Sequence, residues 1–169
     1  MDEFRENDIV WLPSHEFITL TSDMKLYPEI ETGGLLIGYR VKHKNYSEWV
    51  VTHLTHAGPN ATHNPTSYEP DYEYDQAQAD KLFHASGGSE YYIGDWHTHP
   101  NGAPEASWLD KRSLYTNAKR SSHTEHSTLM LIVGGSHKDP LPQAFSGKFN
   151  GNIRFWNWCR SKAQLNFSC

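Results

Sequence analysis

The chain has 169 residues, of which 37% are hydrophobic and 21% are charged, and its formal net charge is −5. This length suits one domain that can bury an apolar core, so we expect a single domain over residues 1–169. The lack of a dense lysine or arginine block argues against a nucleic-acid partner. We see neither a signal-peptide pattern nor an apolar run of roughly 20 residues that could span a membrane, so we expect a cytoplasmic protein.

The N-terminal part predicts a strand, a helix and a second strand. Residues 9–13 (IVWLP) are short and apolar, which is typical of a strand. Residues 14–28 carry apolar side chains at helical spacing, with Ser14 as the expected N-cap and Pro28 as the stop. Two glycines open the apolar run at 33–41, which predicts a buried strand.

The middle of the chain predicts a strand, a loop and a helix. Residues 48–57 are the expected hairpin or meander partner of the preceding strand. Residues 58–75 are rich in Pro, Asn, Thr and Ser, and they predict a long loop of the kind that is often functional. An overlapping helix is expected over 70–88, with Asp71 at its start and a glycine pair at its end.

The C-terminal half predicts further alternation of strands and helices. Strands are expected at 90–99 and 127–135, a helix at 107–120, and two final strands at 143–149 and 152–160. Alternating strands and helices with hairpin-like pairs among them indicate a mixed sheet packed by helices. The expected fold class is therefore α/β or α+β.

The segment GDWHTHP at 94–100 holds two histidines two positions apart. Alternate side chains of a strand point to one face, so His97 and His99 should share a face. Ser107 and Asp110 follow at the start of the next predicted helix, one turn apart. This Ser-x-x-Asp pattern is close to a capping box, which alone would explain both residues. The two interpretations are compatible, because an acid in the first turn also points out of the helix end toward the histidine pair.

Two neutral imidazoles and one carboxylate are the ligand set of a catalytic zinc ion. Zinc is tetrahedral, so three protein ligands leave one position for water, and the ion lowers the pKa of that water toward about 7. Such an enzyme also needs a base for the proton and a donor for the negative charge that develops on the substrate. The spacing therefore raises a zinc-dependent hydrolase as a hypothesis.

Five residues together resemble the motif of the JAMM (MPN+) metalloproteases: Glu31, His97, His99, Ser107 and Asp110. The motif reads Glu, His-x-His, seven residues, then Ser-x-x-Asp. The resemblance implies that His97, His99 and Asp110 bind zinc. It also implies that Glu31 is the general base, which passes its proton to the leaving amine, and that Ser107 donates a hydrogen bond to the oxyanion. The implied fold is cytidine-deaminase-like, a mixed β-sheet flanked by helices.

The chain further resembles a bacterial branch of this family over residues 9–135. The implied substrates are isopeptide or peptide bonds after the C-terminal tail of a ubiquitin-like protein or of a conjugated defence protein. The tail would bind as an extended strand in a groove beside the metal. The implied partners are E1-like and E2-like enzymes, or the cyclic-nucleotide synthase of a CBASS antiphage operon. The aromatic tail at 152–169 carries no such resemblance.

Several alternatives stay open at this point. The same chemistry could trim the tail of a sulfur-carrier protein, and a non-catalytic MPN-type scaffold would share the fold. Glu29 would replace Glu31 as the base if the register were shifted by two residues. Cys159 and Cys169 are too few for a cysteine-rich zinc module, so we interpret them as reduced thiols. A looser cluster, for which strand and loop positions are a simpler explanation than a second metal, consists of His53, His56 and His63.

Overall fold

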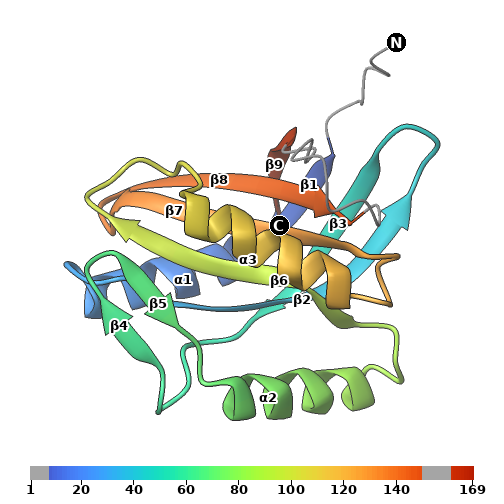
Figure 1. Ribbon diagram of the computed structural model, residues 1–169, viewed down its shortest axis with the longest axis horizontal. Coiled ribbons are helices and arrows are strands. Elements are labelled where there is room, and N and C mark those ends of the chain that lie inside the picture. Colours follow the sequence, from blue (N-terminus) through green and yellow to red (C-terminus); the bar gives the residue numbers. More distant parts are fainter. Residues whose placement is uncertain (1–7, 150–160) are drawn as a thin grey trace.

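The computed structural model describes residues 8–149 and 161–169 of the chain (Figure 1). The helices and strands follow in the order β1 (Ile9–Pro13), α1 (Ser14–Leu26), β2 (Gly33–Lys42), β3 (Ser47–Leu54), β4 (Thr62–Asn64), β5 (Ser67–Glu69), α2 (Tyr72–Ala85), β6 (Tyr91–Pro100), α3 (Trp108–Arg120), β7 (Ser127–Ser136), β8 (Asp139–Lys148) and β9 (Ser161–Ser168). This mixture of strands and helices confirms the expected fold class. Among the described helices, none combines the length and the apolar character that crossing a bilayer requires.

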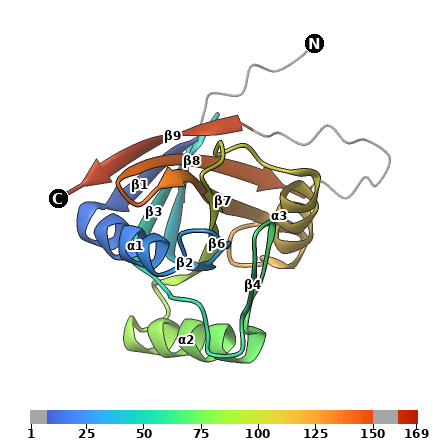
Figure 2. The same ribbon diagram turned by 90° about the vertical axis from the view of Figure 1, so that its left-hand side faces the viewer.

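A large mixed sheet forms the centre of the molecule, with the strand order β1–β3–β2–β6–β7–β8–β9. β2 pairs antiparallel with β3 and β6, β6 pairs parallel with β7, and β7 pairs antiparallel with β8. Parallel pairing of β1 with β9 closes the sheet into a barrel, and Figure 2 shows β9 crossing over β8 toward β1. The sequence patterns indicate strands but not this closure, because a strand pattern does not name its partner.

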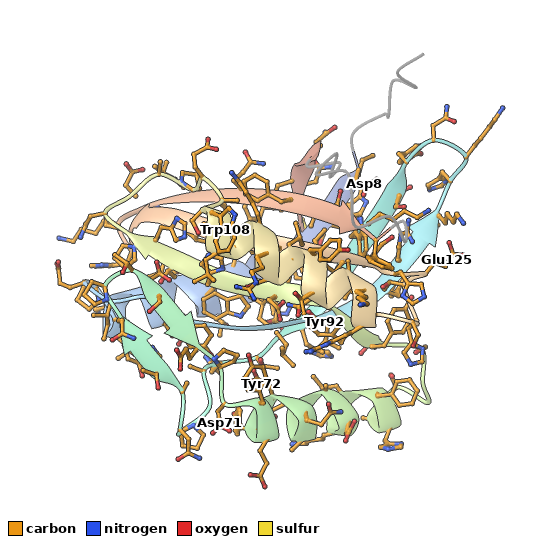
Figure 3. All side chains as sticks on the ribbon, in the orientation of Figure 1. Asp8, Asp71, Tyr72, Tyr92, Trp108 and Glu125 are labelled. Carbon is orange, nitrogen blue, oxygen red and sulfur yellow. The ribbon has the colours of Figure 1, made fainter. Side chains whose placement is uncertain are left out.

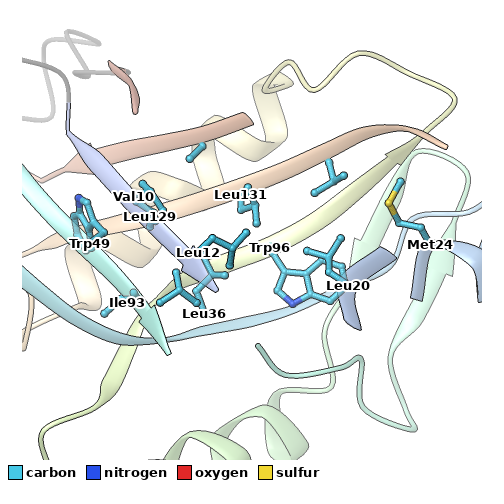
Figure 4. Packing of buried hydrophobic residues seen from close by; sticks show 13 residues of the cluster. Val10, Leu12, Leu20, Met24, Leu36, Trp49, Ile93, Trp96, Leu129 and Leu131 are labelled. Atoms are coloured by element: carbon cyan, nitrogen blue, oxygen red, sulfur yellow. The ribbon is translucent and has the colours of Figure 1, made fainter. Parts of the chain in front are cut away.

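The interior of the barrel is apolar (Figure 4). Its buried residues come from α1 and from most of the barrel strands: Val10, Leu12, Leu20, Met24, Leu36, Trp49, Val51, Ile93, Trp96, Leu129, Leu131, Val133 and Ala144. A second buried cluster, Leu114, Met130, Ile132 and Phe145, lies where α3 packs on β7 and β8. β6 therefore has one face toward the core and one face outside the barrel, on the side that carries α3.

α2 begins and ends as predicted. The Asp71 side chain accepts a hydrogen bond from the backbone N–H of Tyr74 at 3.2 Å, which makes Asp71 the N-cap. Beyond the helix, Gly87 and Gly88 have φ values of 65° and 84°. Glycine adopts this left-handed conformation without a steric penalty, which explains the pair at this helix end.

Two local predictions are wrong. Ser14 does not cap α1, because Pro13 occupies the N-cap position and the Ser14 hydroxyl donates to the carbonyl of Ser168 at 3.1 Å instead. The expected loop at 58–75 contains the short hairpin β4–β5 and the first turn of α2. The expected strand at 152–160 lies outside the described residues.

Candidate metal centre

The end of β6 presents His97 and His99 on one face, as the period of a strand predicts. Their Nε2 atoms are 3.1 Å apart, and only 8% of the surface of His97 is exposed. The Nδ1 atom of His99 lies 3.2 Å from the carbonyl oxygen of Ala103. A carbonyl can only accept, so Nδ1 carries a hydrogen in either charge state, and whenever the ring is neutral its lone pair is on Nε2. The lone pair is thereby available on the side that faces His97.

Asp110 meets the two imidazoles from the first turn of α3. Its Oδ1 is 3.2 Å from Nε2 of His97, and its Oδ2 is 3.6 Å from Nε2 of His99. The same carboxylate completes a capping box with Ser107: Oδ2 accepts from the Ser107 N–H at 2.7 Å, and the Ser107 hydroxyl accepts from the Asp110 N–H at 3.2 Å. Capping and convergence on the histidines therefore occur together.

The pairing of β2 with β6 brings Glu31 to the same place. The antiparallel register pairs Gly33 with His97, and just before β2 the Thr98 N–H donates to the Thr32 carbonyl, so Glu31 lies next to the end of β6. Glu31 is 8% exposed, and its Oε1 is 3.9 Å from Nε2 of His99. Glu29, by contrast, is exposed and lines a cavity of about 240 Å³ at the end of α1. The structure thus brings Glu31, and not Glu29, to the histidine pair.

The hairpin β4–β5 borders the site on the side of Glu31. The carbonyl of Asn64 accepts a hydrogen bond from the Glu31 N–H at 2.8 Å, and Nδ1 of His63 is 2.9 Å from the Glu31 carbonyl oxygen. The His63 ring stacks on Tyr27, with 4.2 Å between ring centroids. The sequence does not predict this hairpin, because two polar strands of three residues carry no hydrophobic period and the local signal is a density of turn residues.

The pKa values of Asp110, His99 and Glu31 are shifted by different interactions. Burial acts to raise the pKa of Asp110, but hydrogen bonds from His97 and His99 hold that pKa well below its usual range. The hydrogen bond with Asp110 raises the pKa of His99, against the effect of burial. Burial raises the pKa of Glu31, and the nearby His97 and His99 partly offset this. The site therefore holds an ionised carboxylate beside the imidazoles and a second carboxyl group that takes a proton more readily.

The donor atoms fit a small tetrahedral metal ion. The nitrogens of His97 and His99 and a carboxylate oxygen of Asp110 all lie within 4.8 Å of one another. Zinc bonds of about 2.0–2.2 Å place neighbouring donors of a tetrahedron about 3.3 Å apart. The two Nε2 atoms are 3.1 Å apart, Oδ1 of Asp110 is 3.2 Å from His97, and its Oδ2 is 3.6 Å from His99, all close to this value. Two imidazoles and one carboxylate are also a donor set that such ions accept.

The looser cluster of His53, His56 and His63 does not converge on one point. Nδ1 of His56 is 2.7 Å from a carboxylate oxygen of Asp23, and His53 lies between the carboxylates of Glu16 and Glu90. His63 belongs to β4 rather than to a loop, which corrects the expectation for that residue. Within the described ranges, the His97, His99 and Asp110 group is the single set of such donors close enough to share an ion.

A known protein family matches most of the chain. Residues 19–149 match the model described as prokaryotic homologs of the JAB domain (Prok-JAB), and they include every residue of the motif. The chain belongs to the Prok-JAB family. The resemblance drawn from the motif is thus confirmed, and the protein is a JAB-domain hydrolase by family.

Curated relatives of this Prok-JAB protein carry peptidase names. It is 31% identical over 141 residues to "Probable metalloprotease y4qB" of Sinorhizobium fredii, covering 83% of this chain and 84% of that protein. It is 33% identical to a "CD-NTase/cGAS isopeptidase" of Escherichia coli and 30% identical to one of Vibrio cholerae, covering 64% and 62% of this chain. The matches span the same shares, 64% and 62%, of those two isopeptidases, which is under two thirds of their length.

A solved structure shares the fold of this Prok-JAB protein. The solution structure of protein DSY2949 from Desulfitobacterium hafniense has a TM-score of 0.64 and 19% sequence identity. The match covers 95% of this chain and 93% of that one. At this identity the likeness concerns the fold alone.

Proposed function

We propose that this Prok-JAB protein is a zinc-dependent isopeptidase or peptidase. It cleaves after the C-terminal tail of a ubiquitin-like protein or of a conjugated bacterial defence protein. The observation that carries the proposal is the convergence of Glu31 with His97, His99 and Asp110, which come from three separate segments of the chain. The isopeptidase names of several relatives support a conjugated protein as the substrate.

His97, His99 and Asp110 would hold the zinc ion. When bound, zinc acts as a Lewis acid and lowers the pKa of a coordinated water toward about 7. The contact of His99 with the Ala103 carbonyl holds the hydrogen on Nδ1 and fixes the ring orientation, so that Nε2 is the ligand atom once the ring is neutral. The Ser107 N–H holds the Asp110 carboxylate in the same way. These contacts would orient the ligands before an ion arrives.

Glu31 would move the proton. As a carboxylate it accepts the proton of the attacking water, and as a carboxylic acid it gives that proton to the nitrogen of the leaving amine. The scissile C–N bond breaks, and the products are a carboxylate and an amine. The raised pKa of Glu31 suits both halves of this cycle, because it lies closer to neutral pH, where one carboxyl group can both accept and return a proton.

Ser107 would stabilise the negative charge on the substrate oxygen. Its hydroxyl oxygen accepts a hydrogen bond from the Asp110 N–H, which leaves the hydroxyl hydrogen free of that interaction. Ser107 is exposed at the N-terminus of α3, where the helix dipole also favours negative charge. It can therefore donate to an oxyanion without losing its role as the helix cap.

The hairpin β4–β5 supports a substrate that binds as an extended chain. It forms a separate two-stranded sheet, in which the Asn64 carbonyl accepts a hydrogen bond from the Glu31 N–H. A tail laid along a hairpin edge would form backbone hydrogen bonds and bring its last residue to the site. E1-like and E2-like enzymes, or a cyclic-nucleotide synthase, would supply such conjugates. The tail of a sulfur-carrier protein has the same extended shape and is the alternative substrate.

The decisive experiment is Glu31→Gln, with zinc content and cleavage measured on the same preparation. We expect zinc to be retained and cleavage to fall about 10²–10⁴-fold, as when a positioned base is lost. Glu29→Gln is the matched control, because Glu29 is exposed two residues away, and it should keep both properties. Undiminished turnover by Glu31→Gln would remove the base assignment, and a wild-type chain without metal affinity would remove the zinc enzyme.

Substrate class needs a separate assay with two kinds of probe. One is a bacterial ubiquitin-like protein joined through its C-terminal tail to a lysine side chain, and the other is a sulfur-carrier protein with a short C-terminal extension. Mass spectrometry identifies the products of each. Cleavage of the first alone supports deconjugation, whereas cleavage of the second alone supports the sulfur-carrier alternative.

A further inference from the structure

The candidate ligands lie on two elements, β6 and α3, but the apolar face of α3 packs on other strands than β6. α3 packs on β7 and β8, where Leu114 and Ala118 are buried. Leu114 rests on the backbone of Gly147, at which an added Cβ would lie 2.9 Å from Cγ of Leu114. Apolar packing of this kind is non-directional, so it does not by itself set how the first turn of α3 lies over β6.

A hydrogen bond joins α3 to β6 directly. Asp95 lies two residues before His97 and therefore on the same face of β6. Asn117 lies seven residues after Asp110, about two turns along the same face of α3. The Asn117 amide donates to Oδ2 of Asp95 at 2.5 Å, and the Tyr92 hydroxyl donates to the same oxygen at 2.8 Å. Figure 3 labels Tyr92, which lies near α3 in this view.

This bond gives α3 a second fixed point relative to β6. Seven residues of helix correspond to about 10 Å, so the Asn117 contact is well separated from Asp110 along the axis. A helix held at one point can pivot about it, whereas two points define its direction. Among the described residues, the side-chain hydrogen bonds and ion pairs between α3 and β6 are those of Asn117 and of Asp110.

We propose that the Asp95–Asn117 hydrogen bond is a positioning contact that holds α3 over β6, so that Asp110 reaches the two histidines and completes the metal centre. This inference rests on the proposed zinc site. Asp95 and Asn117 are positioning residues rather than ligands, because they act through the element that carries Asp110. Contacts that orient metal ligands without touching the metal typically change metal affinity about 10–100-fold.

The test measures zinc affinity by competition with a chelator, and the visible absorption of the cobalt-substituted protein as a report on coordination. For Asn117→Ala we expect zinc affinity to fall by about 10-fold or more and the cobalt spectrum to change. Tyr92→Phe is the matched control, because it removes the other donor to the same Asp95 oxygen and leaves the link to α3. Thr116→Ala is the helix control, since its hydroxyl donates to the Arg112 carbonyl within α3. Both controls should bind zinc as the wild type does.

A charge-swapped pair guards against an unfolded Asn117→Ala variant. Asn117→Asp places two carboxylates against each other and should lose zinc affinity. Adding Asp95→Asn to that variant restores a donor and an acceptor with their positions exchanged, and should recover most of the affinity. A structural effect on α3 alone would not be reversed by a change on β6.

The outcomes separate this inference from the function on which it rests. Wild-type affinity and an unchanged cobalt spectrum for Asn117→Ala, in a chain that binds zinc, would overturn the inference and leave the zinc site standing. Equal losses in Asn117→Ala, Tyr92→Phe and Thr116→Ala would also overturn it. A wild-type chain that binds no zinc would overturn the proposed function and this inference together.

Discussion

Two groups of histidines lie on strand ends of this protein, and they are built differently. At the end of β6 two ring nitrogens and a carboxylate converge within 4.8 Å. At the end of β3 each histidine has its own partner. His56 pairs with Asp23, while the two ring nitrogens of His53 face Glu16 at 3.7 Å and Glu90 at 3.4 Å.

The difference teaches that a histidine near carboxylates is not yet a metal site. His97 and His99 are two residues apart within one strand, so their rings lie on one face. His53 and His56 are three residues apart, and β3 ends between them at Leu54. The decisive property is the direction of the donor atoms, which follows from spacing within a regular strand.

The largest expected effect breaks one group and spares the other. His99→Ala removes a nitrogen donor from the centre, and we expect loss of zinc and a fall in cleavage of about 10³-fold, since a metal contributes several kcal/mol to such reactions. His53→Ala is the matched control variant, because His53 also lies near two carboxylates. It should keep both zinc and activity. Zinc content after dialysis and the cleavage rate measure the contrast, which would collapse if the two variants behaved alike.

Acid should act on the first group at a higher pH than on ordinary histidines. Metal binding needs neutral imidazoles, and the hydrogen bond with Asp110 raises the pKa of His99 above its usual value of about 6.5. Protons therefore compete with zinc from near neutral pH downward, by up to about tenfold in affinity per pH unit for each proton displaced. Asp110 stays ionised over this range because its pKa is held low.

The sign of the stability change tests the same point. A raised histidine pKa stabilises the metal-free fold at low pH, and this contribution is lost as pH rises through the folded-state value. Zinc adds stability in the opposite direction, as pH rises and the ligands lose their protons. Thermal unfolding with and without zinc should thus converge at acid pH and separate above neutrality. A constant separation from pH 5 to 8 would contradict a histidine-bound ion.

The smallest expected effect tests whether the histidines at the end of β3 contribute to stability and not to metal binding. Asp23 is buried at 7% exposure, and His56→Ala leaves its carboxylate without the partner at 2.7 Å. We expect the free energy of unfolding to fall by about 1 kcal/mol, the lower end for an unsatisfied buried acceptor. Zinc content should not change. Urea denaturation measures the loss, and His15→Ala is the exposed control on α1. A loss of zinc from His56→Ala would connect the two groups.

Local patterns predicted much of the site. The histidine pair depends on the two-residue period of a strand, and the Ser107–Asp110 capping box depends on the geometry of one helical turn. Both are properties of neighbouring residues, so no tertiary information is needed. The Asp71 cap and the closing glycines of α2 are predictable for the same reason.

The wrong prediction for Ser14 has a tertiary cause. The Ser14 hydroxyl bonds to the carbonyl of Ser168, more than 150 residues away, and so does not cap its own helix. The glycines that open β2 also have a tertiary role: a Cβ at Gly33 would lie 2.8 Å from the ring of Tyr68, and one at Gly34 would lie 2.1 Å from the carbonyl oxygen of Thr55. Contacts with distant segments leave no periodic signal in the chain.

By itself, the sequence determined which side chains could form a metal centre, because residue type and spacing along one strand or one helical turn are local quantities. Only the tertiary structure decided that they meet. The register of β2 on β6 brings Glu31 near His99, and the packing of α3 on the barrel brings Asp110 to both histidines. Strand register and helix docking are choices among distant partners, and burial of the whole core selects them.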